Sequence, residues 1–271
     1  MNAPVGDSVT VTAFGIGGAP GEGFKLEANG NAPDGQNVRK PLCVAFNAVQ
    51  AVGAAIRQSA VVRDELFITT VIQHDRLGHD GARESIATSL ERLGLDRIDL
   101  VLISAPLSGW DVTGTASALN EQIDEGLVMH AGARYMSQTD LDHLSAKLNA
   151  PLLAHLTELH PLWHADQLRQ HAVDHAYWII ADSPLMQGMA REVREIRRIA
   201  ERAETTPWRV VLSWLHNCAN VATSTWTHDA DQMSANLTAT DVWLDPTELA
   251  EIDQITRRWT GAGHLHLHNE P

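Results

Sequence analysis

The chain has 271 residues, with 20 basic and 34 acidic side chains and a formal net charge of −14 at pH 7. Nucleic acids and anionic membrane surfaces repel such a chain, so we expect neither as a partner. The two cysteines, Cys43 and Cys218, do not suggest a disulfide framework. The N-terminal sequence has no signal-peptide pattern, and the chain has no run of roughly eighteen apolar residues that would span a membrane. We therefore expect a cytoplasmic protein.

The N-terminal region predicts two strands separated by a loop. Val9 to Phe14 is rich in β-branched residues and leads into a turn at Gly15–Gly18, and residues 42–46 form a second short strand. Between them, residues 21–40 are rich in Gly, Asn and Pro and show no helical period. We therefore expect a loop where the first helix of an alternating β/α chain would stand.

Residues 65–106 give the clearest pattern in the chain, which is a strand, a helix and a second strand. Phe67 to Ile72 is a β-branched run and Leu100 to Ile103 is an apolar one, and the segment between them repeats apolar residues at helical spacing up to Gly94. Strands that are buried on both faces and joined by a helix form parallel β/α units. Function in such units lies just beyond the strand C-termini, here at residues 71–74 and 104–110.

The alternation continues to the C-terminal region, with strands expected at 129–134, 151–158, 177–181 and 220–225. Helix starts are indicated by three capping signals, at Asp111, at Thr206 before Pro207, and at Asp245. Eight strands with interleaved helices and no linker predict an α/β fold, a single (β/α)8 TIM barrel over residues 1–271 with a degenerate first helix and a tail at 260–271.

Several motifs, in this order, resemble the aldo-keto reductases. They are ELFITT at 65–70, SLERLGLDRIDLVLI at 89–103, ELHP at 158–161, SPL at 183–185, PWRVVL at 207–212 and the Asn236-Leu237 pair before the last helix. The resemblance runs from about Asp64 to Ile255. It implies a (β/α)8 barrel that reduces carbonyls with NADPH through an Asp-Tyr-Lys-His tetrad, in which a lysine lowers the pKa of the acidic tyrosine.

The tetrad does not survive a residue-by-residue transfer to this chain. The lysine position falls on Val71 and the histidine position on Ser104, while the aspartate and tyrosine positions fall on Pro41 and Phe46 in the divergent N-terminal part. Valine, proline and phenylalanine exchange no protons. The sequence therefore predicts that the reductase chemistry of the family is absent.

The cofactor-binding positions that the resemblance implies are also changed. Arg134-Tyr135 and His155-Leu156 stand where the family binds the nicotinamide amide, and Asp182 stands where an aromatic ring stacks on it. The interval between Arg209 and Arg257 contains no lysine or arginine for the 2′-phosphate. On these grounds we expect no cofactor.

The strand ends nevertheless offer many polar groups. We expect Asp182 and His155 to act as an acid/base pair and Arg134 to stabilise an oxyanion, with Tyr135 and Ser104 beside them. An alternative interpretation makes Arg134 and Asp182 a structural ion pair in the former cofactor volume, and Glu158 a structural residue. The residues expected to contact substrate are Phe46, Val71, Gln73, His74, Trp110, Glu158, Met186 and Trp226.

The histidines of the tail and the tryptophans each allow two interpretations. Histidines 264, 266 and 268 alternate in the tail, and we interpret them as surface residues, so we expect no metal site. Trp178, Trp208 and Trp214 have the spacing of packing residues, whereas Trp110 and Trp226 follow strand ends and could line a pocket.

The leading functional hypothesis from the sequence is a cofactor-independent enzyme, an isomerase, cyclase, dehydratase or lyase. Its expected partner is a hydrophobic small-molecule substrate such as a biosynthetic intermediate. Two alternatives remain beside it. One is an NADPH-dependent oxidoreductase with a non-standard catalytic acid, and the other is a non-catalytic ligand-binding or regulatory protein.

Overall fold

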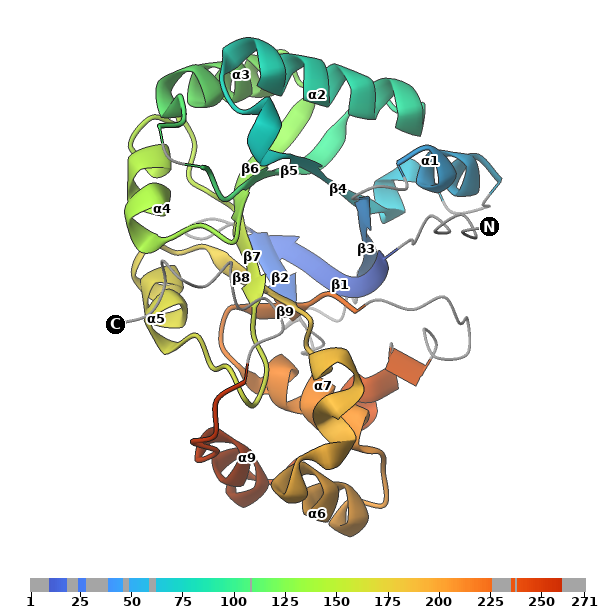
Figure 1. Ribbon diagram of the computed structural model, residues 1–271. Helices are drawn as coiled ribbons and strands as arrows, with labels where there is room; N and C mark the ends of the chain where they lie inside the picture. The colour runs from blue at the N-terminus through green and yellow to red at the C-terminus, as the bar shows by residue number, and fades with distance from the viewer. Residues whose placement is uncertain are drawn as a thin grey trace, which may run out of the picture.

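The computed structural model places helices around the outside of a curved sheet (Figure 1). The residues that it describes are 10–18, 24–27, 39–45, 49–58, 62–107, 109–225, 235–236 and 238–259. The expected tail at 260–271 lies outside them. Among these residues, no helix combines the length and the apolar character that a membrane crossing requires.

Seven consecutive parallel strands form the wall of the barrel, each hydrogen-bonded to the next in chain order. They confirm the expected α/β barrel, because apolar strands joined by helical crossovers pair in parallel. The strands are β3 (Arg39–Ala45), β4 (Phe67–Ile72), β5 (Ile98–Ser104), β6 (Val128–Arg134), β7 (Ala154–Glu158), β8 (Trp178–Asp182) and β9 (Val221–Thr223).

The N-terminal strands differ from the expectation. β1 (Thr10–Gly18) runs through the glycines that we expected to turn, and pairs antiparallel with β3. β2 (Phe24–Glu27) lies inside the expected 21–40 loop and pairs antiparallel with β1. A connection between parallel strands needs a crossover of a dozen or more residues, usually a helix. The Gly- and Asn-rich segment 21–40 instead contributes β2 to an antiparallel pair. Figure 1 shows the sheet curling so that β1 comes back towards β9.

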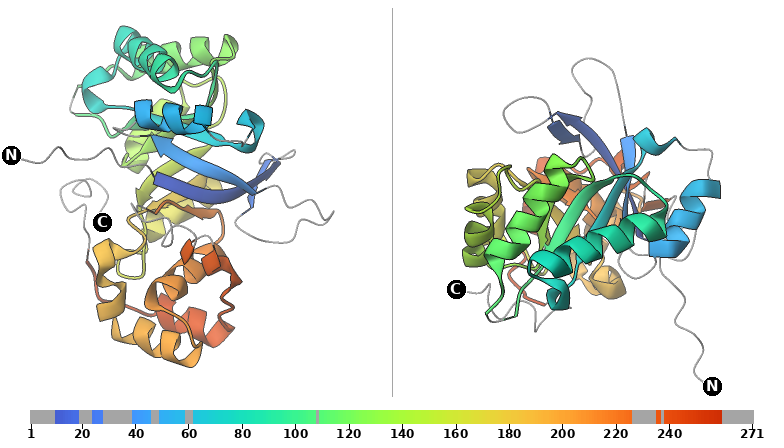
Figure 2. Two further views of the ribbon diagram at one scale, coloured as in Figure 1. Left: turned by 90° about the vertical axis from the view of Figure 1, so that its right-hand side faces the viewer. Right: turned by 90° about the horizontal axis from the view of Figure 1, so that it is seen from above.

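Helices and short 3-10 turns follow most strands and cover the outside of the sheet (Figure 2). The α-helices are α1 (Val49–Gln58), α2 (His79–Leu93), α3 (Val112–Asp124), α4 (Gln138–Ser145), α5 (Asp166–Asp174), α6 (Arg194–Arg202), α7 (Pro207–Asn217) and α9 (Pro246–Asp253). The 3-10 helices are η1 (Arg63–Glu65), η2 (His74–Arg76), η3 (Met186–Glu192) and η4 (Thr238–Asp241).

The core has two layers, because successive side chains of a strand point to opposite faces. On β5, Val101 and Ile103 pack outwards with helix residues such as Ile86. Leu100 and Leu102 point inwards and pack with other apolar side chains inside the barrel. This alternation decides which residues at the strand ends face the barrel mouth.

The signals for helix ends at Gly94, Asp111 and Asp245 are confirmed, whereas Thr206 stands at the N-cap position of α7 but its side chain makes no capping hydrogen bond. Gly94 ends α2 in the left-handed conformation with φ 67°. Asp111 accepts a hydrogen bond from the Gly114 N–H at 2.8 Å. Asp245 forms a full capping box with Glu248 at the start of α9.

Replacement of Asp245 by alanine should lower the free energy of unfolding by about 1 kcal/mol. Its carboxylate accepts from the N–H groups of Thr247 and Glu248 at 2.7 and 2.9 Å, and both donors lose this partner. Urea unfolding measures the change, with the exposed Thr247→Ala as the matched control from the same turn. An equal loss in both variants would mean that the cap contributes nothing specific.

Candidate functional site

The inner face of the barrel changes from apolar to polar at the C-terminal ends of its strands. The polar side chains at this point are Ser104, Arg134, Glu158 and Asp182. Three of them follow an inward-facing apolar residue of their own strand by two positions, and Arg134 is the register partner of the inward-facing Leu156. Ser104 is the register partner of Arg134, and Glu158 is the partner of Asp182. Four neighbouring strands therefore bring two carboxylates, a guanidinium and a hydroxyl to one level of the barrel.

Tyr135 and Asp182 are joined by a short hydrogen bond in this polar layer. The Tyr135 phenol donates to Asp182 Oδ2 at 2.6 Å, and the Ser183 N–H donates to Asp182 Oδ1 at 2.9 Å. The Arg134 guanidinium lies over the Tyr135 ring, 4.9 Å from its centroid. Burial, and then the Asp182 carboxylate, raise the pKa of Tyr135 far above its usual range. Tyr135 is therefore a protonated hydrogen-bond donor at neutral pH.

A cavity of about 900 Å³ opens beside this layer, between the ends of β6, β8 and β9 and the segments η3 and α7. This volume is at the upper end of the range of small-molecule and cofactor pockets. The lining combines polar side chains with a turn of exposed backbone, and consists of Gln73, Arg134, Asp182, Ser183, Pro184, Leu185, Gln187, Gly188, Ala190, Arg191, Trp208, Thr225 and Asn236.

The turn after β8 holds an unusual backbone beside the cavity. Ser183 and Gln187 have φ of 51° and 53°, and Tyr135 across the site has φ 55°. Side chains other than glycine adopt this left-handed region at a cost of about 1 kcal/mol or more, and such residues concentrate at functional sites. Gly188 has φ 89°, and no heavy atom lies within 4 Å of the position that a Cβ would occupy there. A ligand in the cavity can therefore approach this backbone closely.

Three predicted site residues line the cavity directly, namely Gln73, Arg134 and Asp182. Two more lie one contact behind it. The Ser104 hydroxyl donates to Gln73 Oε1 at 3.5 Å, and Tyr135 reaches the cavity wall through Asp182. The predicted oxyanion group Arg134 and the predicted acid Asp182 are therefore brought to one cavity.

His155 is placed on the other face of the sheet from Asp182. Ala154 and Leu156 point into the barrel, so His155 between them points towards the helices. It is fully buried, and its Nε2 accepts the Met136 N–H at 3.1 Å, which leaves the ring hydrogen on Nδ1. The structure does not bring the predicted acid/base pair of His155 and Asp182 together.

The predicted substrate contacts are dispersed. Val71 and Glu158 are buried at inward-facing strand positions but do not line the cavity, and His74 is exposed on η2. Trp110 and Met186 pack in the outer layer of the core. The remaining two, Phe46 and Trp226, lie outside the described residues.

Sequence reasoning missed much of the cavity lining. Trp208, which we expected to be a packing residue, is exposed and lines the cavity, whereas Trp214 is buried as expected. The SPL motif at 183–185 was the available signal, because it follows β8 directly, where barrel sites lie. Arg191 gave no signal of its own.

A cavity at the C-terminal ends of barrel strands is the usual location of an active site in this class of barrel enzymes. The model of the aldo/keto reductase family matches residues 45–257. An aldo-keto reductase of Mycolicibacterium vanbaalenii is 31% identical over 210 residues, which cover 77% of this chain and 75% of the relative. The chain belongs to the aldo/keto reductase family.

Two further comparisons extend this result. Methylglyoxal reductase DkgA of Escherichia coli K12 is 30% identical over 214 residues, covering 78% of this chain and 77% of that protein. The crystal structure of a Klebsiella pneumoniae aldo-keto reductase in complex with NADPH has a TM-score of 0.72 at 19% identity, covering 80% and 81% of the two chains. The second comparison bears on the fold alone.

These relatives correct the functional hypothesis drawn from the sequence. They indicate an enzyme, and specifically a reductase, so the expected cofactor-independent isomerase, cyclase, dehydratase or lyase is wrong. That hypothesis took changed side chains at a few family positions as evidence for a different reaction. Relatives of about 30% identity that are named as reductases outweigh it.

Proposed function

We propose that the chain is an NADPH-dependent reductase of small carbonyl compounds that uses a non-standard set of catalytic side chains. The observation that carries the proposal is the cavity at the strand ends, which has Arg134 and Asp182 in its wall. Family membership supplies the reaction class, and the relatives named as methylglyoxal and glyoxal reductases suggest the substrate class.

The side chains of the cavity fit a dinucleotide. Arg191 supplies a cation for a phosphate group, and its guanidinium pairs with the exposed neighbour Glu192 at 3.2 Å, a surface contact from which it can reorient at little cost. Thr225 and Asn236, which contact each other at 3.4 Å, add neutral hydrogen-bonding groups after β9. The open space at Gly188 allows close approach to the backbone.

Arg134 is the candidate electrophilic catalyst, the group that stabilises negative charge on the carbonyl oxygen of the substrate. When bound, the dihydronicotinamide supplies a hydride to the substrate's carbonyl carbon, and negative charge develops on the carbonyl oxygen. A guanidinium keeps its charge at all relevant pH values and presents several donors in a fixed plane. Held at the end of β6 and facing the cavity, Arg134 would stabilise this oxygen in the transition state.

The Tyr135–Asp182 pair is the candidate group that positions the proton donor. The Tyr135 phenol keeps its proton at neutral pH and donates it in a 2.6 Å hydrogen bond to the Asp182 carboxylate, which lines the cavity. The burial and the carboxylate that raise the pKa of Tyr135 disfavour its phenolate, so Tyr135 would hold Asp182 in place and keep its proton. A water molecule bound to the Asp182 carboxylate would give a proton to the substrate alkoxide, and the hydroxide left behind would be neutralised by the solvent.

Titration of the purified protein with NADPH should quench tryptophan fluorescence with a micromolar Kd, because Trp208 lies in the cavity wall. Replacement of Arg191 by methionine should weaken binding by about 10-fold, the value of one charge-assisted hydrogen bond to phosphate. Arg194→Met is the matched control, since Arg194 is also exposed but does not line the cavity.

A Kd that is equal for the wild type and Arg191→Met would remove Arg191 from the cofactor site. Failure of the wild type to bind NADPH at millimolar concentration, together with no loss of absorbance at 340 nm with methylglyoxal, would overturn the proposed function itself.

A further inference from the structure

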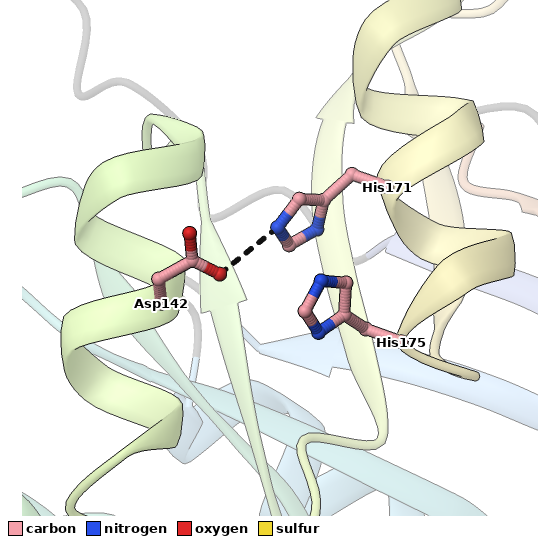
Figure 3. Close-up of side chains that lie close together, drawn as sticks. All are labelled: Asp142, His171 and His175. Carbon is pink, nitrogen blue, oxygen red and sulfur yellow. Dashed lines mark hydrogen bonds and ion pairs between the residues drawn. The ribbon is translucent and has the colours of Figure 1, made fainter.

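Three potential metal ligands converge on the outside of the barrel, away from the cavity. Asp142 lies on α4, His171 lies on α5, and His175 is the residue that ends α5 (Figure 3). His171 Nε2 is 3.1 Å from Asp142 Oδ1, and the two imidazole rings stack with centroids 4.1 Å apart. One ligand atom from each of the three residues lies within 4.8 Å of the other two.

Local sequence explains the convergence. His171 and His175 are four residues apart, and this spacing places two side chains on the same face of a helix, one turn apart. α5 is largely polar and was not predicted as an element, and it is anchored by its buried residues Leu168 and Ala172. This anchoring turns the histidine face towards α4, where Asp142 completes the set (Figure 3).

A buried group behind His171 fixes the direction of its ring. The second ring nitrogen, Nδ1, lies 2.9 Å from the Tyr177 hydroxyl, and Tyr177 is buried at the start of β8. The oxygen of the Tyr177 hydroxyl can accept the Nδ1 hydrogen of His171. Metal-binding histidines characteristically donate their other ring N–H to such a partner.

We propose that Asp142, His171 and His175 form a binding site for a divalent transition-metal ion of the Zn²⁺ type, which ties α4 to α5. Two imidazole nitrogens and one carboxylate oxygen are a donor set that suits Zn²⁺ and related ions, whereas Mg²⁺ and Ca²⁺ prefer oxygen donors alone. Asp142 is half exposed and His171 is 12% exposed, so an ion can enter from solvent and keep a water as its fourth ligand.

The site is separate from the reductase cavity. None of its three residues lines the cavity, and α4 and α5 lie on the outer layer of the barrel (Figure 1). Binding would therefore stabilise the fold without a change in the chemistry at the strand ends. Catalysis and metal binding can be tested independently for the same reason.

Calorimetric titration of the chelator-treated full-length protein with Zn²⁺ should find one tight site. We expect His171→Ala and His175→Ala to abolish it, and Asp142→Asn to weaken it by at least about 10-fold. Co²⁺ in place of Zn²⁺ should give visible absorption bands that the same variants lose. His143→Ala is the matched control, because His143 is exposed on α4 next to Asp142 and does not belong to the cluster.

Zn²⁺ at about 100 times its Kd should raise the Tm of the wild type by about 5–10 °C and leave the Tm of His175→Ala unchanged. His175 is exposed, so this variant should fold normally. A variant with all of His264, His266 and His268 replaced by alanine removes the other histidine-rich segment. If that variant loses the tight site, or if His175→Ala binds Zn²⁺ like the wild type, or if the wild type binds none, the proposal is overturned.

Discussion

Replacement of Arg134 by methionine should lower kcat/KM for NADPH-dependent reduction of methylglyoxal by about 100- to 1,000-fold, the usual cost of removing one oxyanion donor. Methionine keeps much of the apolar length of the side chain and removes the charge. The guanidinium faces the cavity at the end of β6 and lies over the Tyr135 ring. Steady-state kinetics followed at 340 nm measures the change.

Two controls separate this role from cofactor binding and from folding. The Kd for NADPH in Arg134→Met should stay within about 3-fold of the wild-type value, whereas Arg191→Met should change the Kd and leave kcat near normal at saturation. Arg134→Lys keeps a charge without the planar set of donors and should recover only part of the loss. A kcat/KM for Arg134→Met that equals the wild-type value would remove Arg134 from the reaction.

The sequence predicted the parallel part of the barrel because its strands are apolar on both faces. Strand β4 is a run of mostly β-branched residues and β5 contains an uninterrupted apolar run from Leu100 to Ile103, and the caps at Gly94, Asp111 and Asp245 are short-range signals that depend on one or two residues. Such local features are visible without any knowledge of the partner strands.

The features that were missed depend on contacts between distant residues. β2 is four residues long and pairs with β1, a partner that its own composition does not specify. α5 is too polar and too short for its helical period to stand out, although Leu168 and Ala172 are its buried face. The His171–His175 pair was overlooked together with that helix.

The candidate site was predicted only in part. Arg134 and Asp182 stand at strand ends, where the barrel topology places side chains in one cavity. His155 also stands in a strand near its C-terminal end, but the period of two puts it on the opposite face. The cavity wall from Ser183 to Arg191 depends on left-handed backbone conformations, which cannot be predicted from residue types other than glycine.

Replacement of His160 by alanine should lower the free energy of unfolding by about 3–5 kcal/mol, because it breaks a buried pair with a carboxylate. His160 and Glu158 are both fully buried. The Leu162 N–H donates to His160 Nδ1 at 3.2 Å, so the ring hydrogen is on Nε2 and is donated to Glu158 Oε1 at 3.1 Å. The ring also packs against Trp259, with centroids 5.6 Å apart.

The loss should reach the candidate site as well as the fold, because Glu158 is the register partner of Asp182. His160→Gln restores a side-chain N–H donor of similar reach and should recover a substantial part of the stability, whereas the exposed His143→Ala should change it by less than about 0.5 kcal/mol. Urea unfolding of the three variants makes the comparison. If His160→Ala and His143→Ala were equally stable, the Glu158–His160 pair would have no role in holding the strand ends in place.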